Sequence, residues 1–238
     1  MYCRKISIMR KPSFLFIILI SLWITLSVFS AHSVTHANSG LTKEKALELR
    51  IMSFNIRFGV ADDGENSWSN RREVLFGVID DFNPDVVGLQ EDFAFQTKEI
   101  IQALPGYGKI AVSDTRGSNR GIHNAILYRM DRFQVEEKGT FWFSDTPEVP
   151  GSKHWGNHRP IICTWAGLRE KESGQVFYIY NVHLDYESPA SREKSVVLLA
   201  HRITQKKNSD TFVVTGDFNS RESSVNIMYL KGGATLPG

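Results

Sequence analysis

Two apolar, β-branched runs that stop at polar residues constrain the fold of this chain most. One run is Pro84–Leu89, and Glu91 follows it closely; the other is Thr211–Thr215, and Asp217 and Asn219 follow it. Short apolar runs of this kind are typical of buried strands. Carboxylates at the ends of buried strands lie on rigid supports at a sheet edge, where clefts form.

Two further predicted strands also end at polar residues. Asn55 closes the run Ile51–Phe54, and His183 follows the run Phe177–Val182. If the four strand ends meet, they deliver Asn, Glu, His and Asp/Asn to one site. Carboxylate and amide oxygens suit a hard cation such as Mg²⁺, which keeps waters for a substrate phosphate. The pattern therefore predicts a divalent cation and phosphate chemistry.

Each of these residues has a less specific interpretation. Glu91 alone is a solvated carboxylate at a strand end. His183 either packs in the strand or stabilises charge on a transferring phosphoryl group. Asp217 and Asn219 point to one side if the chain stays extended, so that Asp orients or deprotonates a nucleophile and Asn donates to a phosphoryl oxygen. Alternatively they form an Asx turn. Gly216 permits close approach of another group.

The order of predicted elements indicates one α+β domain. Apolar periodicity predicts β-α-β-α at the start, with parallel pairing, and then mainly strands. This mixture fits two mixed sheets packed face to face with helices outside, a four-layer α/β sandwich. The predicted strands are 49–56, 85–89, 125–128, 133–135, 161–168, 176–184 and 211–215, and the predicted helices are 70–82 (capped by Ser69 or Asn70), 93–104 and 191–206.

The first 37 residues have the anatomy of a secretory signal peptide. Basic residues precede an almost wholly apolar stretch, Phe14–Ser30, and small residues follow it. An uncleaved membrane anchor is the alternative. We expect residues 1–37 to be removed, 38–48 to be a polar lead-in, and 49–238 to form the domain of an exported protein, periplasmic or extracellular.

The net charge and the cysteine content limit which binding partners and which disulfides are expected. The predicted signal peptide holds four of the 28 Lys and Arg and none of the 26 Asp and Glu, so its removal changes the net charge from +2 to −2. Nucleic acid is compatible with this charge but not favoured by it. Cys163 is then the one remaining cysteine, so no internal disulfide is expected. We expect a monomer without stable membrane association.

Five motifs, in this order, resemble the endonuclease/exonuclease/phosphatase superfamily, which includes DNase I-like nucleases, sphingomyelinases and inositol phosphatases. The resemblance runs from about Leu49 to the end of the chain and includes features of a bacterial secreted branch. The motifs are Ser53-Phe54-Asn55-Ile56-Arg57, Gln90-Glu91, Asn124-Ala125-Ile126-Leu127-Tyr128, Asn181-Val182-His183-Leu184 and Gly216-Asp217-Phe218-Asn219.

The resemblance implies hydrolysis of phosphate esters with Mg²⁺ or Mn²⁺. By position, Glu91 holds the metal with help from Asn55. Asp217 and Asn219 orient the nucleophilic water and the phosphate, and His183 stabilises the transition state. The substrate is a phosphate ester of open class, diester or monoester.

The chain departs from the family pattern in three places. It stops at Gly238 without the terminal Ser-Asp-His of the family, which leads us to expect a truncated sandwich without its last strands and with impaired activity. Ile122 and Ile161 stand where Glu and Arg are usual, although Arg159 is near. Two alternatives to an exported phosphoesterase are an exported binding protein that uses the remaining cleft without catalysis, and a chain that does not fold alone.

Overall fold

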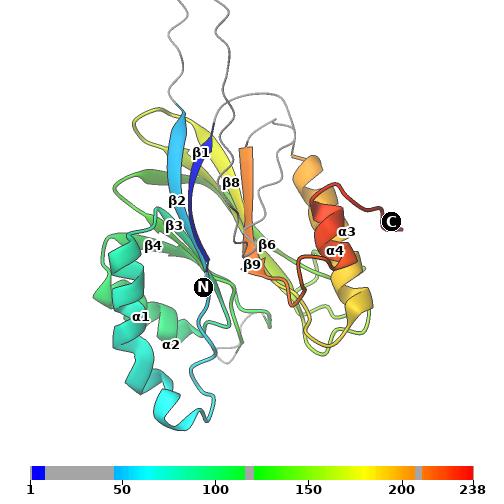
Figure 1. The fold of residues 1–238 in the computed structure, drawn as a ribbon, viewed down its shortest axis with the longest axis horizontal. Coiled ribbons are helices and arrows are strands. Elements are labelled where there is room, and N and C mark those ends of the chain that lie inside the picture. Colours follow the sequence, from blue (N-terminus) through cyan, green and yellow to red (C-terminus); the bar gives the residue numbers. More distant parts are fainter. Residues whose placement is uncertain (1, 9–45, 116–120, 207–210, 238) are drawn as a thin grey trace, which may run out of the picture.

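Two mixed β-sheets pack face to face, and helices cover the outer face of each (Figure 1). The computed structural model describes residues 2–8, 46–115, 121–206 and 211–237. Helices α1 and α2 lie beside one sheet, and α3 and α4 lie beside the other. This confirms the predicted α+β, four-layer arrangement.

Among the described residues, the first sheet has five strands in the order β1-β2-β3-β5-β4. β2 and β3 are parallel, as the β-α-β pattern predicts, and Asn55 pairs with Gln90 at their ends. The outer helices are α1 (Trp68–Phe82) and α2 (Ala94–Ala103). The strands are β1 (Tyr2–Ile8), β2 (Leu47–Asn55), β3 (Val86–Gln90), β4 (Tyr107–Ile110) and β5 (Ile126–Arg129).

The second sheet, in the part of the chain that the structure describes, has four strands in sequence order, β6-β7-β8-β9. Helix α3 (Pro189–Thr204) connects β8 to the parallel β9, and His183 pairs with Asp217 at their carboxyl ends. Helix α4 (Val225–Leu230) follows β9. The strands are β6 (Phe133–Trp142), β7 (Ile162–Glu170), β8 (Val176–His183) and β9 (Thr211–Asp217).

Three apolar clusters hold the layers together. Ile51, Val86, Ile179 and Val213 meet between the two sheets. Leu75, Ile79 and Ile100 join the first sheet to α1 and α2, and Val196 and Leu199 join the second sheet to α3. Burial of these side chains stabilises the sandwich by about 25 cal/mol for each Å² removed from water, so the sheets form a fixed frame for what their strand ends carry.

Most predicted elements are confirmed, and the differences concern short elements and the ends of longer ones. Strand β4 and helix α4 were not predicted because both are short, and β6 extends well beyond 133–135 since its solvent-facing positions are polar. Helix α1 begins at Trp68, with Ser67 as N-cap, instead of at Asn70. The extra residues are helical because the Trp68 ring is buried, and its Nε1 donates to Glu99 over 2.8 Å.

The predicted signal peptide falls mostly outside the described residues. Tyr2–Ile8 is described and forms β1, which pairs antiparallel with β2; the apolar stretch 14–30 and the lead-in residues 38–45 are not described. Leu47 and Glu48, predicted as the end of the lead-in, belong to β2. In the part of the chain that the structure describes, no helix has the length and apolar character needed to cross a bilayer.

Candidate active site

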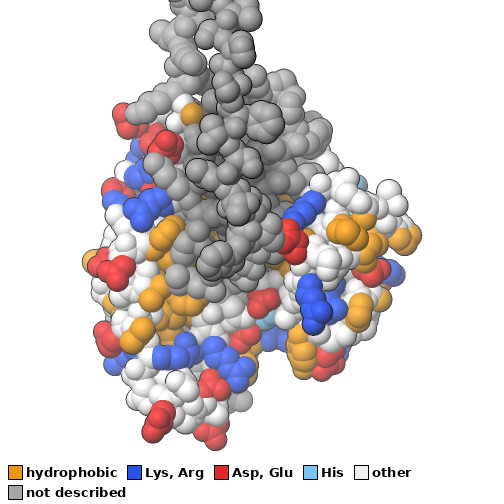
Figure 2. Space-filling view, in the orientation of Figure 1, with side chains coloured by type: hydrophobic (Ala, Val, Ile, Leu, Met, Phe, Trp, Pro, Cys, Tyr) orange, Lys and Arg blue, Asp and Glu red, His pale blue; other side chains and the backbone are white. Residues whose placement is uncertain are grey.

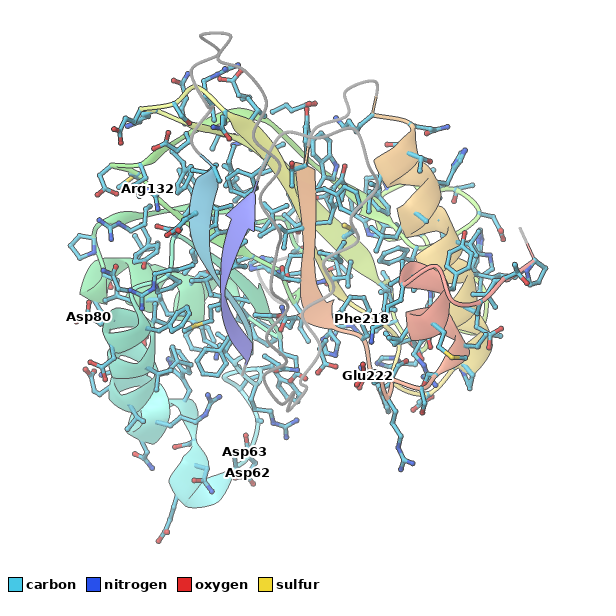
Figure 3. All side chains as sticks on the ribbon, turned by 45° about the horizontal axis from the view of Figure 1, so that its top comes forward. Asp62, Asp63, Asp80, Arg132, Phe218 and Glu222 are labelled. Carbon is cyan, nitrogen blue, oxygen red and sulfur yellow. The ribbon has the colours of Figure 1, made fainter. Side chains whose placement is uncertain are left out.

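Asn55 joins the two sheets at the carboxyl ends of their strands. Its Nδ2 atom lies 2.9 Å from Oε1 of Glu91 and 3.0 Å from Oδ2 of Asp217. His183 pairs with Asp217 in the β8–β9 register, and its Nε2 lies 3.9 Å from Oδ2 of that residue. The four predicted strand-end residues therefore converge. Figure 3 shows Phe218 at the end of β9 and Asp62 and Asp63 in the loop after β2, at the same end of the sandwich.

Glu91 leaves β3 through a strained backbone. Its φ is 62°, in the left-handed region that a non-glycine residue seldom adopts. This turn aims the carboxylate at the loop after β2, where Oε2 accepts the Phe58 N–H over 3.3 Å. The next residue, Asp92, is buried and accepts the Ala125 N–H over 3.0 Å. Such strain persists where the surrounding structure fixes it, and it clusters at functional sites.

Asp217 and Asn219 form an Asx turn, the second of the two arrangements that the sequence left open. Asn219 has φ 46°, and its N–H donates to Oδ1 of Asp217 over 3.0 Å. The turn carries the Asn219 amide towards β8, where Nδ2 lies 2.8 Å from the Leu184 carbonyl and 3.0 Å from Nε2 of His183. Since the carbonyl needs a donor, the amide nitrogen faces both groups, and Nε2 of His183 is an acceptor.

The environment of His183 favours the neutral ring. Burial lowers the pKa of its imidazole, and the carboxylates of Asp217 and Glu91 raise the pKa by a smaller amount. The pKa of His183 is therefore lowered overall. The hydration that a charged ring loses on burial outweighs its attraction to the two carboxylates. A neutral His183 that accepts from Asn219 carries its proton on Nδ1.

A buried polar network lies directly beneath these groups, and sequence reasoning missed it. Gln90 Nε2 lies 2.7 Å from Oδ1 of Asn181, and Thr215 Oγ1 lies 3.0 Å from the same oxygen. Ser53 Oγ accepts the Gly216 N–H over 2.9 Å. The network thus links β2, β3, β8 and β9, the strands that carry the site. The available signal was a polar residue at the end of one apolar run, Gln90, and another inside a second run, Asn181.

Gly216 has the role predicted for it. A Cβ atom there would lie 2.3 Å from the carbonyl oxygen of Val182, so only glycine lets β9 approach β8 this closely.

A cavity of about 530 Å³ opens beside the converged residues. Arg159 lines it and is held by Asp114, with 2.8 Å between Nη2 and Oδ2. Ile122 and Ile161, the two departures from the family pattern, also line it. The remaining lining includes Arg57, Phe58, Glu91, Asn124, His158, His183, Tyr186 and Asn219.

The donor set fits a hard cation that keeps most of its waters. No group of three or more His, Cys, Asp or Glu side chains suited to a metal occurs among the described residues. Mg²⁺, however, commonly takes only one or two protein carboxylates together with waters and phosphate oxygens. Glu91 can provide one such carboxylate. A cation would also offset the negative charge of Glu91 and Asp217, whose carboxylates both accept from the Asn55 amide. Asn55 directs Nδ2 at the carboxylates and Oδ1 at the Arg57 N–H, so coordination by its oxygen requires the amide to turn.

Comparison with known proteins agrees with this geometry. Residues 52–233 match the Endonuclease/Exonuclease/phosphatase family. The chain belongs to this family. A protein of Acanthamoeba polyphaga mimivirus is 33% identical over 182 residues, which are 72% of this chain and 67% of that protein.

Solved structures of family members show the same fold. A family protein from Bacteroides thetaiotaomicron has a TM-score of 0.73 and 34% identity, over 77% of this chain and 68% of that one. A mannosyl-6-phosphatase from the same organism has a TM-score of 0.73 and 34% identity, over 76% of this chain and 69% of that one. The family includes phosphatases and nucleases that hydrolyse phosphate esters.

Proposed function

We propose that this protein hydrolyses a phosphate ester with the help of Mg²⁺ or Mn²⁺. The observation that carries the proposal is the Asn55 amide, which brings the carboxylates of Glu91 and Asp217 to one point beside a cavity lined by cationic side chains. When bound, the cation would polarise a phosphoryl oxygen and neutralise developing charge. Glu91 would hold it, with Asn55 as a second ligand if its amide turns.

The other side chains have separate tasks in this proposal. Asp217 orients the attacking water and accepts its proton, since its carboxylate is half-buried and fixed by the Asn55 amide and by the N–H of Asn219. Asn219 and His183 face the phosphate. Neutral His183 offers the proton on Nδ1 as a hydrogen bond to oxygen atoms on which charge accumulates.

A phosphomonoester of a sugar is the first substrate class to test. The mannosyl-6-phosphatase is 34% identical to this chain, and Phe58 and Tyr186 give the cavity wall aromatic surface that suits a sugar ring. A nucleic acid diester is less favoured, since Lys and Arg side chains are interspersed with Asp and Glu on the face shown in Figure 2.

We also propose that the protein is exported and monomeric. The support is the signal-like composition of residues 1–37 and the large apolar core of the described sandwich.

The test is release of p-nitrophenol from p-nitrophenyl phosphate and from bis-p-nitrophenyl phosphate, with Mg²⁺, Mn²⁺ or EDTA. Metal-dependent turnover that falls about 100-fold or more in Glu91→Gln and Asp217→Asn supports the proposal. Glu136→Gln is the matched control, because Glu136 lies on β6, is paired with Arg169 of β7 and does not line the cavity. Turnover that persists in EDTA, or in both site variants, would contradict it.

Ligand binding without catalysis is the alternative function. It predicts that inorganic phosphate with Mg²⁺ raises the melting temperature while no ester is cleaved. Loss of that shift in Glu91→Gln would assign the cleft to binding alone.

A further inference from the structure

A second imidazole lies beside the cavity and is held by a buried carboxylate. Nδ1 of His158 lies 2.8 Å from Oδ2 of Asp185, and the backbone N–H of His158 donates to the same oxygen over 2.9 Å. His158 lies in the segment before β7 and Asp185 lies just after β8, so the fold creates the pair. Neither residue was selected from the sequence, because they are far apart along the chain.

The hydrogen bonds made by Asp185 favour the ionised form of its carboxylate. Its side chain is fully buried, and Oδ1 accepts the N–H groups of Glu187 over 2.9 Å and Ser188 over 2.8 Å. Burial raises the pKa of Asp185, but these hydrogen bonds and those from His158 together lower it, and the net direction is downward. An ionised carboxylate accepts hydrogen bonds only, so it fixes the proton of His158 on Nδ1.

This arrangement leaves Nε2 of His158 available. In the part of the chain that the structure describes, Nε2 of His158 makes no hydrogen bond to another residue. The ring also packs edge to face on Tyr186, with 4.6 Å between the centroids. The Asp185 carboxylate at Nδ1 and the adjacent Tyr186 ring hold the imidazole in one orientation, as an acid–base group requires.

The roles assigned so far leave one step of ester hydrolysis, protonation of the leaving oxygen, without a side chain. His183 accepts from Asn219 through Nε2, and its environment favours the neutral ring, while Asp217 is assigned to the attacking water. None of these groups supplies a proton to the departing oxygen. His158 lines the same cavity as Glu91 and His183.

We propose that His158, oriented by Asp185, is the general acid that protonates the leaving group. The inference rests on the proposed function. Water bonds to phosphorus and loses a proton to Asp217. The bond from phosphorus to the leaving oxygen breaks with its electron pair on that oxygen, and imidazolium His158 transfers its Nε2 proton there.

A series of para-substituted phenyl phosphates tests this role, because p-nitrophenolate departs without protonation and phenolate does not. His158→Asn should lower kcat for phenyl phosphate by up to about 100-fold and leave kcat for p-nitrophenyl phosphate within a few fold. Asp185→Asn should give the same pattern, since the amide no longer fixes the ring proton on Nδ1. His154→Asn is the matched control, because His154 pairs with Asp145 over 3.1 Å away from the cavity lining.

Equal losses on every ester in the His158 variant would overturn the inference while leaving the proposed function intact. Absence of turnover by the wild-type chain with Mg²⁺ and Mn²⁺ would instead overturn the proposed function. The ¹⁵N resonance of His158 Nε2 tests the role of His158 independently of turnover. A shift on addition of phenyl phosphate with Mg²⁺, absent in Glu91→Gln, supports a ligand-facing imidazole, and an unchanged resonance overturns it.

Discussion

A Cβ atom on Gly88 would lie 2.6 Å from Oδ1 of Asn181, in the opposite sheet. It would also lie 2.2 Å from Oγ1 of Thr215. The two sheets therefore approach each other closely at the buried polar network, just beneath the site. Asn181 uses this proximity to donate to the carbonyls of Leu89 over 2.7 Å and Ala125 over 3.0 Å. The spacing between the two halves of the site depends on the absence of a side chain at Gly88.

Gly88→Ala should destabilise the fold by about 1–3 kcal/mol, as overpacking of a dense core does. The added methyl group must displace Asn181 and Thr215, and both belong to a network with few alternative partners. Urea unfolding measures the change. Gly77→Ala is the matched control: Gly77 lies in α1 with open space around its Cα, and alanine there should stabilise by about 0.5–1 kcal/mol. Unchanged stability in Gly88→Ala would show that the sheets separate easily.

The network also bears on what the sequence could predict. Strand ends follow from apolar runs, so the convergence of Asn55, Glu91 and Asp217 could be predicted before any coordinates. The buried partners could not, because Gln90 and Asn181 resemble ordinary polar positions until two sheets face each other. The Asp185–His158 pair was missed for the same reason, since strands and loops distant in sequence create it.

Local backbone geometry was the other feature that the sequence left open. Alternation along an extended strand would place Asp217 and Asn219 on one face, but the left-handed conformation of Asn219 ends that regularity. An Asx turn and an extended strand are both compatible with Asp-Phe-Asn. The hydrogen bonds from Asn219 to Leu184 and His183 favour the turn, and these contacts are tertiary.

Stability should fall in mild acid because of His183. Burial lowers the pKa of its imidazole in the folded protein, so the unfolded chain binds a proton at higher pH than the native protein. The stabilisation by neutral His183 is complete above the unfolded pKa of about 6.5 and is lost as pH decreases below it. Unfolding free energies of wild type and His183→Gln should therefore converge, or reverse in order, between about pH 7.5 and 5.5. A difference that stays constant with pH would contradict a buried neutral ring.

Cys163 should not react with thiol reagents in the native protein. The thiol lies in the apolar cluster between the second sheet and α3, and burial raises its pKa well above the ordinary value. Since the thiolate is the reactive form, native labelling by iodoacetamide should proceed only through opening of the fold. A Cys3→Ser chain makes Cys163 the single target. Mass spectrometry should find it unlabelled in buffer and fully labelled in urea, and rapid labelling in buffer would refute its burial.

Asn55→Asp should make stability depend more strongly on a divalent cation. The substitution replaces an amide that donates to two carboxylates by a third carboxylate. Without metal, the loss of hydrogen bonds to charged groups costs about 2 kcal/mol, which lowers the melting temperature by about 6 °C in a domain of this size. With Mg²⁺ the extra charge strengthens binding, so the metal should raise the melting temperature of the variant more than that of wild type. Asn66→Asp is the matched control, since it adds the same charge at an exposed position of the loop after β2. If Mg²⁺ shifts both variants and wild type equally in thermal scans against EDTA, the cation does not bind where Glu91 and Asp217 meet.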